Sequence, residues 1–290
     1  MSLFFRPTQQ AANVIALVAA HDADIRDCFL AFGGNGTLEP RPFLSALAAQ
    51  CTSAKFALSP AVVHTSLWAL AILCGHTQSR DRPPQFEIVK ICMPLFSSML
   101  TPGVNDETVV FSALTAVSAL LPQYDHATLS PLFEAIVKLL DDAPAVGETQ
   151  TLVKRSVRVQ RAAMTCVSEV AATNTGSIKG LVGYKDGNKS RLLSVLPKLL
   201  WSGDVALRLS AAQFAVQCLP QGFAAEIVGS DIVKEMTRLL STDDAVRGMA
   251  ARFFRELCKI LLPQQLVDLV HRGMVKMLSM NFAHLTLFMR

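Results

Sequence analysis

Apolar and polar positions recur along most of this chain with the period of an α-helix, and short polar turns separate the helical segments. The clearest unit runs from Phe223 to Leu262. Its first amphipathic helix ends at Leu240, and its second helix places five apolar residues on one side: Val246, Ala250, Phe253, Leu257 and Ile260. Because neither helix buries its apolar side alone, the pattern predicts helix pairs stacked on neighbouring pairs.

The same pairing recurs upstream of this unit. The leucine that ends the first helix of a pair lies at positions 100, 140, 200 and 240. We explain the long interval from 140 to 200 by an extended link before Gln150 and by a polar, basic loop inserted at 174–189, since stacked repeats accept insertions in loops. The predicted organisation is a set of capping helices at 1–40 followed by repeats at 41–77, 86–122, 128–174, 190–220, 222–262 and 263–290.

The run LLSTDDAVRGMAARFF resembles the armadillo/HEAT superfamily in its paired leucines, its turn aspartate, and its Val-Arg followed by two alanines and an apolar pair. This resemblance implies an all-α, right-handed superhelix (solenoid) of about five to six armadillo/HEAT-like repeats. A short helix and Gly229 before the run favour the armadillo variant. Asp244 and Arg247 favour HEAT, and the sequence leaves both open. Proteins of this superfamily generally bind partners along their second helices or their turns, so the resemblance implies a non-catalytic protein-interaction scaffold.

Charge is concentrated in one part of the chain. The formal net charge is +4, from 27 basic and 23 acidic residues. Between Gln150 and Arg191 there are only two acidic residues, Glu169 and Asp186, against eight basic ones: Lys154, Arg155, Arg158, Arg161, Lys179, Lys185, Lys189 and Arg191. This segment therefore carries more positive charge than the chain as a whole.

A helix that begins at about Gln150 would place Lys154, Arg158 and Arg161 on one side. Arg208 and Arg247 follow turn aspartates in later repeats. We predict a partner-binding site composed of six basic residues: Lys154, Arg155, Arg158, Arg161, Arg208 and Arg247. It would favour an acidic or phosphorylated protein segment. The structural alternative is a solvated helix face together with Asp–Arg pairs that stabilise turns.

Two other functions stay open. The basic ridge at 150–191 would also suit a nucleic-acid backbone, although only Tyr184 adds an aromatic ring there. The apolar C-terminal sequence NFAHLTLFMR would suit a structural subunit that docks into a larger assembly or forms a homo-oligomer. For Trp201, at the end of a first helix, packing against the next repeat is favoured over anchoring a partner.

The remaining composition predicts no enzyme, cofactor or metal site. The seven cysteines include no CxxC pair, and the six histidines stand in no recognisable catalytic pattern. Spread singly, the cysteines are typical of reduced core residues in a cytoplasmic protein, or alternatively a nuclear one. No apolar run has the length of a membrane span.

Overall fold

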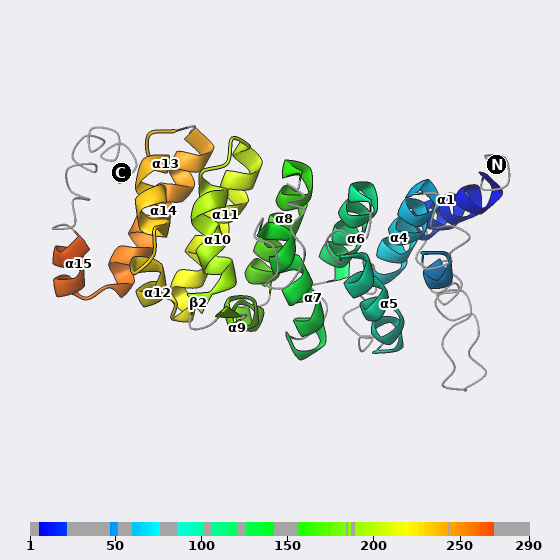
Figure 1. Ribbon diagram of the computed structural model, residues 1–290, viewed down its shortest axis with the longest axis horizontal. Coiled ribbons are helices and arrows are strands. Elements are labelled where there is room, and N and C mark those ends of the chain that lie inside the picture. Colours follow the sequence, from blue (N-terminus) through cyan, green and yellow to red (C-terminus); the bar gives the residue numbers. More distant parts are fainter. Residues whose placement is uncertain are drawn as a thin grey trace, which may run out of the picture. The chain divides into compact units, whose positions relative to one another are not determined.

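A computed structural model places the described part of the chain in helices, joined by turns and one short hairpin (Figure 1). The described residues are 6–21, 47–51, 60–75, 86–100, 106–120, 126–141, 156–173, 175–183, 185–186, 189–242 and 244–269. The chain divides into two compact units, Met1–Glu169 (unit 1) and Val170–Arg290 (unit 2). The division falls inside α8 (Val157–Thr173). None of the helices in the described part is long and apolar enough to cross a membrane.

Unit 1 contains successive helix pairs that pack on one another. Its described helices, besides the N-terminal part of α8, are α1 (Arg6–His21), a helical segment at 47–51, α4 (Pro60–Gly75), α5 (Phe86–Met99), α6 (Glu107–Leu120) and α7 (His126–Leu140). Helix α4 packs between α1 and α6, and α5 lies against both α6 and α7. The second helices of neighbouring repeats, α4 and α6, are therefore in direct contact.

Small residues allow this close contact. Ala69 of α4 and Ala113 and Ala116 of α6 are completely buried, alongside larger residues such as Leu67 and Leu114. A hydrogen bond between the His64 ring and the Ser112 hydroxyl also joins α4 to α6. Burial of the apolar side chains supplies most of the stabilisation, since each fully buried leucine contributes about 1.5–3 kcal/mol.

Unit 2 contains two three-helix repeats with the same order of elements. The first consists of α9 (Thr175–Gly183), a hairpin of β1 (Lys185–Asp186) with β2 (Lys189–Ser190), α10 (Arg191–Leu200) and α11 (Val205–Cys218). After η2 (Leu219–Gln221), the second consists of α12 (Ala224–Val228), α13 (Ile232–Leu239) and α14 (Asp244–Ile260), and α15 (Pro263–Leu269) follows. Helix α10 packs on α13, and α11 on α14. The second and third helices of the first repeat thus contact their counterparts in the next repeat.

The structure confirms several sequence predictions. The leucines at 100, 140, 200 and 240 are all buried at the ends of first helices. Pro94 lies inside α5, as the predicted bounds of that helix require. On α14, the predicted core residues Val246, Ala250, Phe253 and Leu257 are buried. The predicted all-α solenoid is confirmed as the fold class, with one hairpin of two-residue strands added to it.

The prediction of an inserted polar loop at 174–189 is wrong for most of its length. Residues Thr175–Gly183 form α9, which occupies the same place in its repeat as α12 in the next. Three glycines in this segment disfavour a helix in the sequence. Burial of Ile178, Leu181 and Val182 outweighs that preference.

Two further predictions need correction. The helix expected from about Gln150 begins at Val157, because the Ser156 hydroxyl accepts a hydrogen bond from the Val159 backbone and caps the helix there. Ile260, predicted to lie in the core, is 41% exposed at the end of α14. The second capping helix in 1–40 and the end of the 263–290 repeat lie outside the described residues.

Candidate functional site

Helices α6, α8 and α11 are the second helices of their repeats, and each begins directly after an N-cap residue. Each begins after a capping residue, Asp106, Ser156 or Asp204, whose side-chain oxygen accepts a backbone hydrogen bond at 2.8, 3.4 and 2.7 Å respectively. Such caps satisfy donors that the first turn of a helix leaves free. Residues that lie the same number of positions after the cap are therefore equivalent in the three helices.

Positions 2, 5, 9 and 13 after each cap lie on the exposed side of these helices. Their described residues are exposed or half-buried: Thr108, Phe111 and Thr115 on α6, Arg158, Arg161, Thr165 and Glu169 on α8, and Ala206, Leu209, Gln213 and Gln217 on α11. Among these residues, the only basic ones are the two arginines of α8. Among these three helices, α8 is therefore the one that carries arginines at the compared positions.

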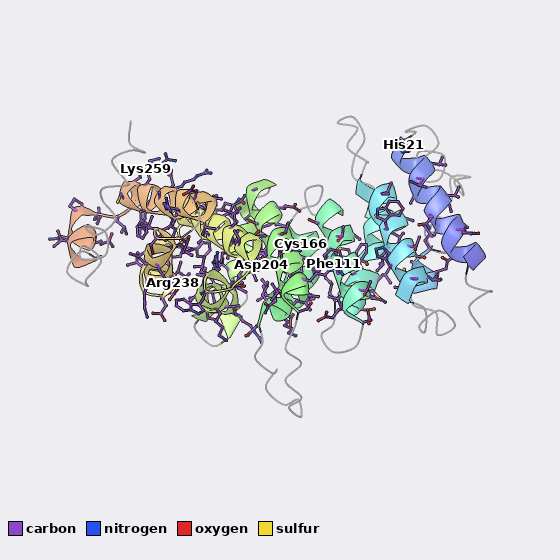
Figure 2. All side chains as sticks on the ribbon, turned by 90° about the horizontal axis from the view of Figure 1, so that it is seen from above. His21, Phe111, Cys166, Asp204, Arg238 and Lys259 are labelled. Carbon is purple, nitrogen blue, oxygen red and sulfur yellow. The ribbon has the colours of Figure 1, made fainter. Side chains whose placement is uncertain are left out.

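Arg158 is positioned by the neighbouring helix. Its guanidinium carbon lies 4.1 Å from the centroid of the Phe111 ring on α6. This cation–π contact holds the charged group over a half-buried ring while leaving it exposed to solvent. Arg161 lies one turn further along the same side of α8. Two exposed arginines thus lie on adjacent turns of α8, and Figure 2 labels Phe111, over which the first of them lies.

Polar contacts fix α8 against α6. The Ser156 backbone N–H at the start of α8 donates to the Glu107 carboxylate at 3.0 Å, and the Ser118 hydroxyl donates to the Glu169 carboxylate. Between these contacts the buried Cys166 thiol donates to the Leu114 carbonyl at 3.1 Å. Burial raises the pKa of the Cys166 thiol to about 12, so it stays protonated and unreactive at neutral pH. These three contacts join α6 to α8, the helix that carries the two arginines.

The other predicted site residues lie elsewhere. Lys154 and Arg155 are outside the described residues. In unit 2, Arg208 donates to the Ser202 carbonyl at 2.9 Å, and Arg247 donates to the Thr242 carbonyl at 2.7 Å. Arg247 also forms an ion pair with Asp244 at 2.9 Å. Each of these two arginines therefore binds the turn that precedes its own helix, which matches the structural alternative, and their part in partner binding stays a prediction.

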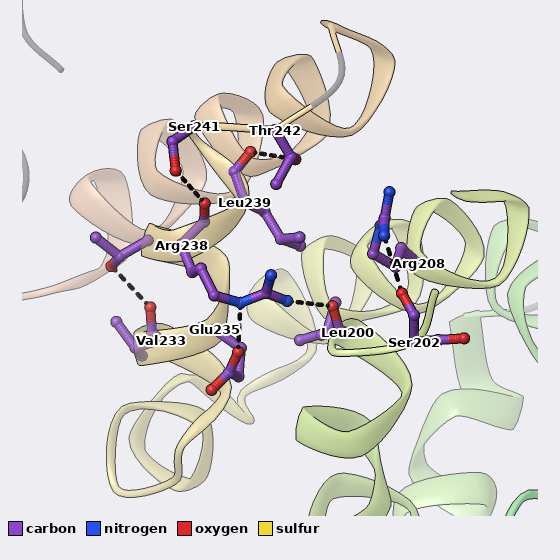
Figure 3. Close-up of polar contacts among 10 residues, drawn as sticks. Leu200, Ser202, Arg208, Val233, Glu235, Arg238, Leu239, Ser241 and Thr242 are labelled. Atoms are coloured by element: carbon purple, nitrogen blue, oxygen red, sulfur yellow. Dashed lines mark hydrogen bonds and ion pairs between the residues drawn. The ribbon is translucent and has the colours of Figure 1, made fainter. Parts of the chain in front are cut away.

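Sequence analysis did not single out Arg238, which joins the two repeats of unit 2 (Figure 3). Its Nη2 donates to the Leu200 carbonyl at 2.9 Å, its Nε pairs with Glu235 at 3.0 Å, and its guanidinium lies 3.9 Å from the Trp201 ring centroid. Trp201 thus packs against the next repeat, as predicted, although it is 63% exposed. The sequence did contain a sign of this position. A basic residue lies two residues before the leucine that ends the first helix in three of the repeats: Lys138, Lys198 and Arg238.

A second basic surface was also missed. Arg252, Arg255 and Lys259 are exposed on one side of α14, at the spacing of three and four residues that brings side chains together on a helix. Glu256 lies among them, with an Oε2 to Lys259 Nζ distance of 3.0 Å. The hydrogen bond from Lys259 lowers the pKa of the Glu256 carboxyl.

Of the residues the structure describes, no three His, Cys, Asp or Glu form a group able to hold a metal ion.

The sequence matches no protein-family model and no curated protein. Solved structures are similar in fold. An engineered protein is 19% identical with a TM-score of 0.62, covering 89% of this chain and 93% of its own. A designed armadillo repeat protein in complex with the peptide (KR)4 is 17% identical with a TM-score of 0.62, covering 88% and 95%. Computationally designed armadillo repeat proteins for modular peptide recognition are 18% identical with a TM-score of 0.59, covering 86% and 92%. The chain therefore has the armadillo-like repeat fold, an all-α solenoid.

Proposed function

We propose that this chain is a non-catalytic scaffold that binds an extended segment of a protein partner on the exposed side of its second helices. The fold supports this, because a designed protein of the same fold is in complex with a peptide. Stacked helix pairs present repeated, solvent-facing helices over a buried core, which is a geometry suited to binding rather than to enclosing a substrate.

The observation that carries the proposal is the arrangement of Arg158 and Arg161 on α8. Arg158 is held over the Phe111 ring, so less side-chain entropy is lost when an anion binds to it. Arginine pairs favour carboxylates and phosphates because guanidinium groups form charge-assisted, often bidentate hydrogen bonds. The bound segment is therefore acidic or phosphorylated. A basic peptide such as the one on the designed protein would be repelled at α8.

The experiment compares the unaltered chain with the charge-reversed variant Arg158→Glu/Arg161→Glu. Proteins captured from extract by the unaltered chain are quantified, and synthetic acidic and phosphorylated segments of the captured proteins are then titrated directly by fluorescence anisotropy. A matched control, Lys198→Glu/Lys234→Glu, reverses two exposed lysines on the first helices α10 and α13. We expect the α8 variant to lose the acidic segments and the control to keep them. Equal binding by both variants would remove α8 as the site.

Nucleic acid is the competing ligand for the same arginines. A labelled duplex that binds the unaltered chain with a steep dependence on salt, and does not bind the α8 variant, would assign the surface to phosphate backbones instead. No shift of the duplex at low salt would leave the protein partner as the ligand.

A second candidate function rests on the segment from the end of α14 to α15. Leu262 is 66% exposed, Val267 51% and Ile260 41%. Exposed apolar residues close together along the chain favour a protein contact, and a second copy of the chain is the simplest partner. Light scattering across a dilution series tests this. A constant monomer mass at all concentrations would exclude self-association through this end.

A further inference from the structure

The exposed side of α14 carries three basic residues whose ion pairs, among the residues the structure describes, stay within this helix. Arg255 is 66% and Lys259 61% exposed, and Arg252 is exposed one turn before them. No hydrogen bond or ion pair joins Arg252 to another residue that the structure describes. At 1.5 Å per residue, Arg252 and Lys259 are separated by about 10 Å along the helix axis. These three residues therefore form a compact positive stripe on the last long helix that the structure describes.

Glu256 already occupies the donors of two of these residues. The Lys259 ammonium lies 3.0 Å from both carboxylate oxygens of Glu256, and the Arg255 Nε lies 3.4 Å from one of them. These ion pairs are solvent-exposed, so each contributes little to folding. A carboxylate from another chain would meet the same donors, with Arg252 as an additional one. Glu256 thus stands where the carboxylate of a partner would bind.

We propose that this side of α14 is a second docking surface, at which Arg252, Arg255 and Lys259 bind an acidic peptide segment that displaces the carboxylate of Glu256. The residues differ from those of the α8 site, so this surface does not depend on the function proposed for α8. Alternate side chains of an extended peptide point to the same side about 6.8 Å apart. Two acidic residues of such a peptide fit within the length of the stripe.

The observations favour a peptide over nucleic acid. Phe253 is buried, and the half-buried Phe254 packs edge-on against it with ring centroids 5.3 Å apart, so neither ring on this helix is presented for base stacking. Three cations, two of them paired with Glu256, also neutralise few phosphates, whereas nucleic-acid binding draws its affinity from many such contacts. A short acidic segment requires only two or three.

The test measures the anisotropy of a fluorescein-labelled, alternating Glu-Ser octapeptide titrated with the full chain at low ionic strength. We expect Arg252→Glu/Arg255→Glu to weaken binding about tenfold and Glu256→Gln to strengthen it about threefold, since each exposed charge pair changes affinity by a few-fold. The matched control for the second variant is Glu134→Gln, which breaks the 2.7 Å ion pair with Lys138 on α7 without altering α14. Circular dichroism confirms that each variant is folded.

The outcomes separate the two surfaces. Tighter binding by Glu256→Gln but not by Glu134→Gln, together with the loss in the arginine variant, supports docking at α14. If Arg158→Glu/Arg161→Glu weakens binding and the α14 variants leave it unchanged, the α14 inference is overturned while the α8 proposal stands. A labelled DNA duplex that binds more tightly than the octapeptide, and only with Arg252 and Arg255 intact, would overturn the peptide as occupant.

Discussion

The guanidinium of Arg238, on α13, lies over the ring of Trp201, at the end of α10 in the preceding repeat, with 3.9 Å between its central carbon and the ring centroid. The same side chain donates to the Leu200 carbonyl, one of the acceptors that the end of α10 leaves without a helical partner. One arginine therefore caps a helix of one repeat from the next. Repeat proteins gain their cooperativity from such contacts between neighbours.

Replacing Arg238 with Ala should lower the free energy of unfolding by about 1–2 kcal/mol, because both the hydrogen bond to Leu200 and the cation–π contact are lost. Arg238→Lys should recover only part of this, since an ammonium group cannot reproduce the planar contacts with Trp201, Leu200 and Glu235 together. Urea denaturation measures both variants. A double-mutant cycle with Trp201→Ala isolates the stacking energy, and a coupling energy of zero would contradict the contact.

Asp204 should act as an N-cap whose removal is costly. Its carboxylate accepts the Leu207 backbone hydrogen bond at 2.7 Å. Asp204→Ala should lower the free energy of unfolding by about 1 kcal/mol, whereas Asp204→Asn should change it little because Asn caps helices equally well. Equal losses in the two variants, measured by thermal and urea denaturation, would show that charge rather than capping matters at this position.

Two glycines of unit 2 should respond in opposite directions to Ala. Gly222 adopts φ 93°, a left-handed conformation that costs an L-residue about 1–2 kcal/mol, so Gly222→Ala should destabilise the fold by about that amount. Gly248 lies within α14 with open space where a Cβ would be placed, so Gly248→Ala should stabilise by about 0.4–1 kcal/mol. Urea denaturation under one set of conditions compares the two variants. A change of the same sign in both free energies of unfolding would contradict the prediction.

The buried Cys166 thiol should make stability fall at alkaline pH. Its pKa is raised to about 12 in the folded chain by burial, whereas an unfolded cysteine titrates near 8.5. Between these values the folded state binds more protons than the unfolded state, so its stability is complete below about pH 8.5 and decreases as pH rises, by about 1.4 kcal/mol per unit for one fully coupled group. Urea denaturation in reductant at several alkaline pH values measures the slope.

Cys166→Ala is the control for this slope. It should be less stable at neutral pH, because a small cavity replaces the thiol, but its stability should fall less steeply above pH 9. Identical slopes for the two chains would show that Cys166 does not carry the effect. Mass spectrometry after thiol labelling of the folded chain adds a second readout, in which exposed Cys258 reacts and buried Cys166 does not.

Sequence periodicity predicted the repeat because each helix must bury one apolar side. The spacing of Leu100, Leu140, Leu200 and Leu240 marked the ends of the first helices, and the stripe headed by Val246 marked the core side of α14. Periodicity failed where local preference and burial conflict. The glycine-rich stretch of α9 reads as a loop in the sequence, but packing of Leu181 and Val182 makes it a helix.

Which charged residues remain available to a partner was decided by the tertiary structure. In the sequence, Arg158, Arg208 and Arg247 are all basic residues of second helices, and all three belong to the predicted binding site. In the structure, Arg158 lies exposed over Phe111, while Arg208 and Arg247 donate to the carbonyls of nearby turns. Arg238 is also occupied by a structural contact, because it donates to the Leu200 carbonyl of another repeat.

The sequence by itself determined the repeat and its buried sides, because the helical period and the hydrophobic effect act on residues close together along the chain. Only the tertiary structure decided how each arginine is used. The Asp–Arg spacing pointed to the turn contacts of Arg208 and Arg247 as one of two alternatives, but the partners of Arg158 and Arg238 come from a neighbouring helix, and no local pattern specifies which group there a long, flexible side chain will reach.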